Sequence, residues 1–117
     1  MKHTDLDDAQ LARAASTFAA LGSEQRLIVL RALVRAGPTG LSIGDLGART
    51  GITGATLTHH MKTLAAARLV RQEKQGRSII CMAADYREIE NLASGLLAEC
   101  CADCDNETCT EDEHCHD

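Results

Sequence analysis

The feature that most restricts the fold of this sequence is a pair of short helical segments, joined by a tight turn, near its middle. In the first, LSIGDLGART, Ser42 and Asp45 have the spacing of a helix-capping box, and Gly51 ends the segment. The second, TGATLTHHMKTLAAARL, carries an apolar stripe at the i, i+4, i+7 spacing of a helix: Leu57, Met61 and Leu64. Two short helices separated by about four residues that include glycine indicate a helix-turn-helix.

Two further helices are predicted before this pair. The first covers residues 4–21, with Thr4 as its N-cap and acidic residues in its first turn, where they suit the helix dipole. The second covers residues 24–36, between the capping residue Ser23 and the breaker Gly37-Pro38. Because this helix is apolar on most sides, we expect it to be central and buried.

A hairpin and a last helix are predicted after the pair. Two apolar-rich segments flank a polar Lys74-Gln75-Gly76 turn, which indicates a β-hairpin. Asp85 can cap a helix over residues 86–100, whose apolar residues recur at helical spacing. Helix-turn-helix followed by hairpin is the order of a winged helix, so the expected fold is mainly α with a small β-hairpin. Few aromatic residues and many Ala and Leu suggest close-packed helices completed by a second chain, a homodimer.

Charge is divided along the chain in a way that the net value of −5 conceals. Residues 22–77 hold nine basic side chains against three acidic ones, a net charge of +6. Residues 99–117 hold eight acids and no base. The middle is therefore a basic module of the kind that binds nucleic acid, whereas the C-terminal segment is acidic.

Five of the six cysteines lie in the last 18 residues. The first twenty residues lack the apolar stretch of a signal peptide, and no apolar run approaches the ~18 residues needed to span a bilayer. We therefore expect a cytoplasmic protein without membrane association. In that reducing compartment, clustered cysteines indicate metal binding or reactivity more than disulfides.

Two stretches, LGSEQRLIVLRAL and TGATLTHHMKTLAAARLVRQEKQGRSI, resemble the ArsR/SmtB family of metal-responsive bacterial repressors. The HH-M-K-x-L run joined to L-V-R-x-x-x-x-G-R carries the resemblance, which covers about residues 10 to 98. It implies a homodimeric repressor, not an enzyme, that binds double-stranded operator DNA with an inverted repeat. Residues 1–98 would form the DNA-binding and dimerisation domain, and residues 99–117 a metalloid-binding tail rich in Cys and acids.

The outer surface of the second helix of the pair, with the hairpin turn, supplies the candidate DNA contacts. Small hydroxyl residues at a helix N-terminus suit close approach to base edges, and basic residues at the hairpin turn suit phosphates. The candidates are Thr53, Gly54, Thr56, Thr58, His59, Lys62, Lys74 and Arg77. For any one of the basic residues, ordinary surface charge remains an alternative. His60, beside the apolar stripe, is expected to be packed and hydrogen-bonded.

The inducer sites common in the family are absent from this sequence. Residues 42–46 (SIGDL) contain no thiol, residues 85–98 contain no histidine, and the second helix contains no cysteine. What remains is Cys100, Cys101 and Cys104. If the last helix continued through them, their sulfurs would share one face beside the surface that pairs the subunits in this family. Because adjacent residues on a helix diverge by about 100°, capturing one ion should unwind or bend the last turn.

Three thiolates without a nearby histidine favour As(III) as the inducer, with Sb(III) also accepted, since both form three bonds in a pyramid. Some arsenic-responsive members of the family are similar in carrying a Cys-Cys pair and a third cysteine here. A trivalent organoarsenical would need only Cys100 and Cys101. A Cd(II), Pb(II) or Zn(II) sensor also remains open. A thiol redox sensor is disfavoured because the surrounding acids oppose thiolate formation.

Two further cysteine-containing patterns have weaker interpretations. Four residues near the C-terminus could form an accessory zinc- or cadmium-type site, or a segment without an essential role: Cys109, His114, Cys115 and His116. Cys81 to Arg87 has the C-x5-R spacing of a phosphatase loop, but the intervening residues include no glycine to wrap an oxyanion. We therefore expect Cys81 to be a small buried residue.

Overall fold

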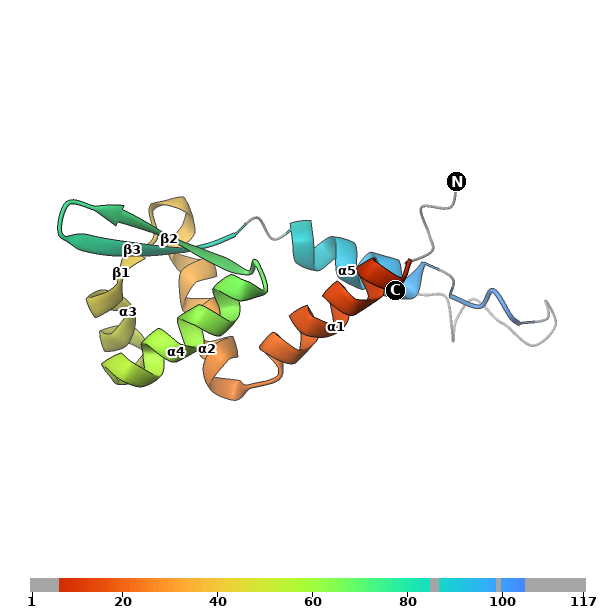
Figure 1. The fold of residues 1–117 in the computed structure, drawn as a ribbon, viewed down its shortest axis with the longest axis horizontal. Coiled ribbons are helices and arrows are strands. Elements are labelled where there is room, and N and C mark those ends of the chain that lie inside the picture. Colours follow the sequence, from red (N-terminus) through yellow and green to blue (C-terminus); the bar gives the residue numbers. More distant parts are fainter. Residues whose placement is uncertain (1–6, 85–86, 99, 105–117) are drawn as a thin grey trace.

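The computed structural model describes residues 7–84, 87–98 and 100–104 (Figure 1). Within these ranges the elements follow the predicted order of four helices, a hairpin and a last helix, with one short strand added. They are α1 (Asp8–Leu21), α2 (Glu24–Ala36), the 3-10 turn η1 (Gly37–Thr39), β1 (Leu41–Ser42), α3 (Ile43–Thr50), α4 (Gly54–Ala66), β2 (Val70–Gln75), β3 (Ser78–Ala83) and α5 (Arg87–Leu97). The prediction of a winged helix-turn-helix, mainly α with a small β-hairpin, is confirmed.

The sheet has three antiparallel strands in the order β1-β3-β2, so the predicted hairpin gains an edge strand. Leu41 pairs with Cys81 and Ser42 with Ile80. A two-residue strand is too short to produce an alternating pattern, which explains why β1 was not predicted. Because β1 directly precedes α3, its pairing with β3 joins the start of α3 to the β2–β3 hairpin, which is called the wing below.

Of the predicted capping residues, Ser23 and Ser42 are confirmed, the cap of the first helix is corrected, and Asp85 lies outside the described residues. The Ser23 hydroxyl accepts a hydrogen bond from the Arg26 N–H at 3.3 Å, and the Ser42 hydroxyl accepts one from Asp45 at 3.1 Å. The first helix, however, begins at Asp8, and its N-cap is Asp7 rather than Thr4, which lies outside the described residues. Asp7 is favoured because its side chain accepts from the Gln10 N–H while its own backbone N–H donates to the Gln10 Oε1 atom, which makes a reciprocal capping box.

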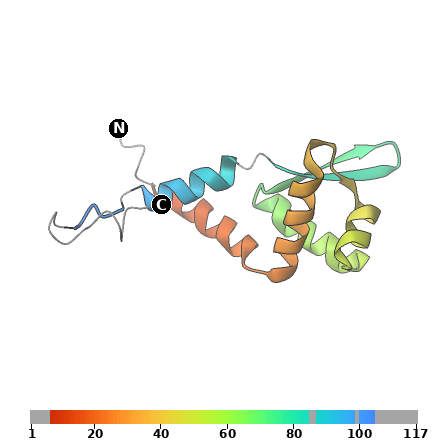
Figure 2. The ribbon, with the colours of Figure 1, turned by 180° about the vertical axis from the view of Figure 1, so that it is seen from behind.

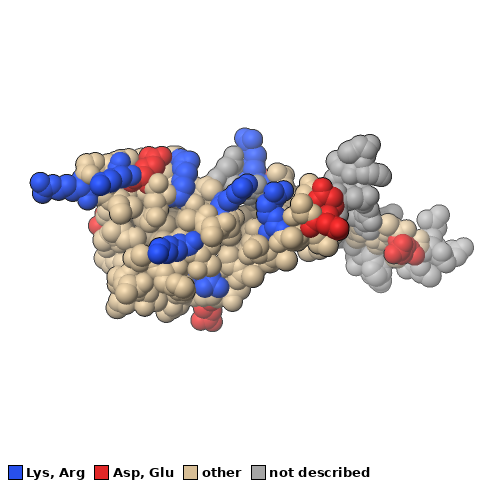
Figure 3. Space-filling model, in the orientation of Figure 1, with Lys and Arg blue, Asp and Glu red and all other residues tan. Residues whose placement is uncertain are grey.

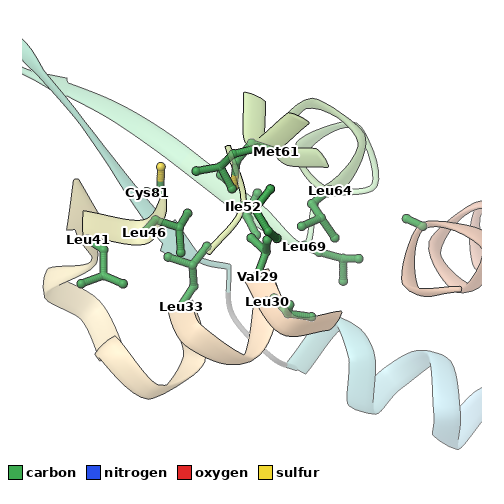
Figure 4. Packing of buried hydrophobic residues seen from close by; sticks show 13 residues of the cluster. Val29, Leu30, Leu33, Leu41, Leu46, Ile52, Met61, Leu64, Leu69 and Cys81 are labelled. Atoms are coloured by element: carbon green, nitrogen blue, oxygen red, sulfur yellow. The ribbon is translucent and has the colours of Figure 1, made fainter. Parts of the chain in front are cut away.

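The core lies between α2, α3, α4 and the base of the sheet (Figure 4). The predicted stripe of α4 is buried, as expected. The prediction for α2 is only partly right, since Val29, Leu30 and Leu33 are buried but Leu27 and Val34 are about half exposed. Apolar residues on most sides of a helix thus do not mean that the same chain buries all of those sides.

Two helices extend away from this body, as Figures 1 and 2 show. Near the start of α5, Ile89 packs against the core, but Leu96 and Leu97 at its end are 64% and 66% exposed. On α1, Leu11 and Phe18 are also exposed. The radius of gyration, 17.8 Å, exceeds the ~13 Å of a compact chain of this length. A single chain therefore leaves apolar surface on both helices uncovered.

Candidate nucleic-acid interface and thiol site

The turn between α3 and α4 is held by local hydrogen bonds that fix the direction of α4. Thr50 donates its hydroxyl to the Leu46 carbonyl at 2.8 Å and accepts from the Ile52 N–H at 3.3 Å. Gly51 adopts the left-handed conformation, with φ 74°, that ends α3 as predicted. Ile52 is buried and anchors the turn to the core. The start of α4 is therefore positioned by both backbone geometry and packing.

The helix α4 separates a buried stripe from an exposed polar face. Its N-cap, Thr53, has extended backbone, and its side chain makes no capping hydrogen bond. All the predicted contact residues are exposed: Thr53, Gly54, Thr56, Thr58, His59 and Lys62 on or before α4, and Lys74 and Arg77 on the wing. Exposed hydroxyls and first-turn N–H groups at a helix start can donate hydrogen bonds to phosphates and base edges.

His60 lies on the buried side of α4, as predicted. Its Nε2 is 2.8 Å from the Oε1 atom of Gln25 on α2, and because an amide oxygen only accepts, Nε2 is the donor of this hydrogen bond. The Nδ1 atom is buried without a hydrogen-bond partner among the described residues. Burial, and secondarily the charges of Arg26 and His59, lower the pKa of His60. The hydrogen bond between His60 and Gln25 therefore joins α4 to α2.

The wing ends in a two-residue connection rather than in the predicted three-residue turn. Gln75 pairs with Ser78, so Lys74 and Gln75 belong to β2, and only Gly76 and Arg77 lie between the strands. Gly76 has a φ of 63°, which a tight hairpin requires. Figure 3 shows Lys and Arg side chains gathered at this tip. Lys74 and Arg77 thus stand at the far end of the sheet.

The cysteines after α5 do not continue the helix. The helix ends at Leu97, the Cys100 N–H donates to the Leu97 carbonyl at 3.0 Å, and the Cys104 N–H donates to the Cys101 carbonyl at 3.0 Å. Cys101 has a φ of 67°, in the left-handed region. The expected helix to residue 100 therefore ends three residues early, at Leu97. Because a left-handed residue cannot lie within a right-handed helix, the condition of a helix continued through Cys101 and Cys104 is not met either.

This turn brings two of the sulfurs together. The Sγ atoms of Cys100 and Cys101 are 3.6 Å apart, well beyond the ~2.05 Å of a disulfide bond. Among the residues that the structure describes, no three potential ligands of the Cys, His, Asp or Glu types are gathered as a metal site. The described cluster is thus a two-thiol pair with Cys104 nearby in sequence. The accessory candidates Cys109, His114, Cys115 and His116 lie outside the described residues.

Cys81 is a core residue, as predicted. It lies in the middle of β3, is fully buried, and its Sγ is 3.8 Å from the Gln72 Nε2 atom. Burial raises the pKa of the Cys81 thiol, and the Gln72 hydrogen bond only partly opposes this shift. A phosphatase-type loop would need a nucleophile in an exposed loop, whereas Cys81 has strand partners on both sides.

Three arginines of the basic module lie together in an arrangement that was not predicted from the sequence. Arg31 and Arg35 on α2 and Arg49 on α3 are exposed and line one groove, with Ile28, Ala32 and Thr50. The i, i+4 spacing of Arg31 and Arg35 could have shown that they share a face of α2. The nearness of Arg49 depends on how α3 packs against α2, which the sequence pattern does not specify.

Comparison with known proteins agrees with this geometry. The model of a helix-turn-helix domain family matches residues 21–73. The HTH-type transcriptional regulator YceK of Bacillus subtilis (strain 168) is 38% identical over 64 residues, which cover 55% of this chain. The match spans 63% of that relative's length.

Two solved structures are similar over most of the chain. An ArsR-like transcriptional regulator from Rhodococcus sp. RHA1 is 31% identical, with a TM-score of 0.67, covering 77% of this chain and 81% of that one. The AntR antimony-specific transcriptional repressor is 27% identical, with a TM-score of 0.61, covering 80% of this chain and 82% of that one.

Within the described residues, no helix is long and apolar enough to cross a membrane.

Proposed function

We infer that this chain, which belongs to the ArsR family of winged helix-turn-helix transcriptional regulators, is a metalloid-responsive repressor. A homodimer binds an inverted repeat in double-stranded operator DNA and releases it when As(III), or Sb(III), binds Cys100, Cys101 and Cys104. The observation that carries this proposal is the pair of sulfurs held 3.6 Å apart directly beyond the end of α5. A DNA-binding surface at one end and a thiophilic site at the other are the two parts of a ligand-operated repressor.

The DNA-contacting role of α4 and the wing is supported by exposure and chemistry. Thr56, Thr58 and His59 are exposed on α4 and offer donors and acceptors of a size that fits the major groove. Lys74 and Arg77 are placed to contact phosphates beside that groove, which adds affinity but little sequence preference. Lys62 extends the same exposed face.

Dimerisation is supported by the uncovered apolar surface of α1 and α5. Leu96 and Leu97 lie on the segment that joins the body to the cysteines, so a partner that covers them also restrains the thiol site. Full burial of a leucine contributes about 1.5–3 kcal/mol. A symmetric pair would hold two α4 helices at the ~34 Å spacing of successive major grooves.

Trivalent arsenic suits the thiols because it forms three bonds to sulfur. Cys100 and Cys101 supply two sulfurs that lie 3.6 Å apart, and Cys104 supplies the third when the turn over residues 101–104 closes. The helix already ends at Leu97, so the switch is closure of this turn rather than unwinding of a helical turn. Closure moves the chain attached to Leu96 and Leu97, which changes the dimer surface and the spacing of the two α4 helices. The similarity to an antimony-specific repressor supports a metalloid.

A second candidate inducer is a trivalent arsenical with one organic substituent, which forms only two bonds to sulfur. The proximity of the Cys100 and Cys101 sulfurs favours it specifically, because such a compound would need no contribution from Cys104. The two candidates therefore differ in their dependence on the third cysteine.

Titration of the DNA-bound protein tests both candidates. Fluorescence anisotropy of a labelled duplex, selected by the protein from a random pool, would be followed as arsenite, antimonite, phenylarsine oxide or cadmium is added. We expect arsenite release to be lost in Cys100→Ser, Cys101→Ser and Cys104→Ser, and kept in the matched control Cys109→Ser. Release by phenylarsine oxide but not arsenite from Cys104→Ser would show the two-thiol mode. Release by cadmium alone, or arsenite release unaffected by the three changes, would refute the proposal.

A further inference from the structure

The arginines of α2 and α3 form a basic surface separate from the exposed face of α4 and from the wing. Arg31 and Arg35 lie one helical turn apart on α2, and Arg49 lies in the last turn of α3. All three are exposed and line the same groove, which also includes the Thr50 side chain. Within the part of the chain that the structure describes, none of the three arginines forms an ion pair with an acidic side chain.

This arrangement is unfavourable for the isolated chain. Like charges at i and i+4 on a helix destabilise it by a few tenths of a kcal/mol, and Arg49 adds a third positive charge to the same groove. A surface with this arrangement attracts an anionic partner. Arginine in particular binds phosphate through two parallel N–H donors, so three of them can contact successive phosphates of a nucleic-acid strand.

The position of the groove connects it to the DNA-contacting end of α4. Arg49 precedes Thr53, the N-cap of α4, by only four residues, and the intervening turn is fixed by the hydrogen bonds of Thr50 and by buried Ile52. In helix-turn-helix proteins the first helix of the pair crosses the DNA backbone while the second enters the groove. Here α3 is that first helix, and its last turn carries Arg49.

We propose that Arg31, Arg35 and Arg49 form a second phosphate-binding surface, which contacts the DNA backbone next to the half-site read by α4. This inference rests on the proposed DNA-binding function and extends it to α2 and to the end of α3. The surface lengthens the DNA footprint of each protomer and contributes affinity without base preference. An acidic protein partner would fit the charge as well, but the continuity with the start of α4 favours DNA.

The dependence of DNA affinity on salt measures such contacts directly. The slope of log K against log [salt] changes by about 0.9 for each phosphate that a protein neutralises. We expect Arg31→Gln/Arg35→Gln/Arg49→Gln to reduce the slope by about two to three per protomer and to weaken binding at least tenfold at 0.15 M salt. The base preference in a selected pool should stay the same. The matched control is Arg13→Gln, which changes an exposed arginine on α1. Its salt slope should differ from that of the wild type by less than about 0.9, the value for one phosphate contact.

Duplex length separates this inference from the proposed function. The wild type should bind a duplex with flanking base pairs more tightly than one trimmed to the two half-sites, and the triple variant should lose that difference. If the wild type binds no duplex, the DNA-binding function itself fails. If it binds DNA and the triple variant keeps the full slope and the flank preference, the second phosphate surface is refuted. If the triple variant keeps its DNA binding unchanged but no longer binds an acidic protein that the wild type binds, the groove is assigned to a protein partner.

Discussion

The winged-helix body and the C-terminal end of the chain differ in how much of their structure one protomer can supply. In the body, Leu33, Leu46 and Leu64 are fully buried, and each helix start has a side-chain cap or a packed turn. At the other end, Leu96 and Leu97 are about two-thirds exposed, α5 ends at Leu97, and Cys101, four residues later, is left-handed. One protomer thus supplies most of the core of the body, although Leu27 and Val34 stay about half exposed, whereas the end of α5 leaves its leucines uncovered. Under the proposed function, this difference would let a ligand rearrange the cysteine-containing end without unfolding the winged-helix body.

The two regions should differ most in thiol reactivity. Cys81 is buried in the sheet and its pKa is raised, whereas Cys104 is exposed. Since global opening costs about 5 kcal/mol or more, Cys81 should react with a thiol reagent at least roughly a thousandfold more slowly than Cys104. Peptide mass spectrometry after timed alkylation would measure both rates. Similar alkylation rates would show that the sheet around Cys81 opens locally, and the two regions would then not differ in thiol accessibility.

Core truncation should affect the body strongly. Leu33→Ala removes a fully buried side chain from α2 and should lower the free energy of unfolding by about 2–5 kcal/mol. Leu27→Ala, on the exposed side of the same helix, is the matched control and should cost less than about 1 kcal/mol. Urea unfolding followed by circular dichroism gives both values. Equal losses would mean that the exposed side of α2 is covered in the assembled protein.

Truncation on α5 should act on assembly instead. Leu97→Ala should weaken self-association by roughly 10- to 100-fold, the equivalent of losing about 1.5–3 kcal/mol of apolar burial. Sedimentation equilibrium measures this change directly. The loss of thermal stability should be larger at high protein concentration, where the wild type is dimeric, and should vanish on dilution. A concentration-independent loss would show that Leu97 packs within its own chain.

A smaller effect should appear in the pH dependence of the body. The folded-state pKa of His60 lies below its ordinary value of 6.5, so the unfolded chain binds more protons below that pH. The stabilisation from neutral His60 is complete above about pH 6.5 and is lost as the pH falls through 6.5 and past the folded value. Urea midpoints at pH 7.5 and 5.5 should therefore differ less in His60→Gln than in the wild type. His59→Gln removes only the smallest of the three contributions that lower the pKa of His60 and should therefore keep most of the wild-type difference.

The body was largely predictable from the sequence because its signals are local. The apolar stripe of α4, the caps Ser23 and Ser42 and the breaker Gly51 each act within a few residues, and the structure confirms each of them. Burial of His60 followed from its place beside the stripe. The wing was predicted as a hairpin, but its turn was placed one to two residues too early because strand register depends on pairing.

The candidate thiol site was less predictable because it depends on where α5 ends. The helical spacing of apolar residues continues past Leu97, and no glycine or proline marks the end, so the sequence favoured a helix through Cys100. The left-handed conformation of Cys101 has no strong local signal. The arginine groove depends on the packing of α3 against α2, which a one-dimensional pattern does not contain.

Arsenic X-ray absorption on the DNA-free, arsenite-loaded dimer tests the central claim most directly. The account predicts one arsenic per protomer bound by three sulfur atoms, with Cys104→Ser reducing the shell to two sulfurs and one oxygen. It further predicts that the loaded wild type no longer binds the duplex that the unloaded protein binds. Arsenic bound without sulfur from Cys100 and Cys101, or a fully loaded protein that still holds the duplex with unchanged affinity, would contradict it.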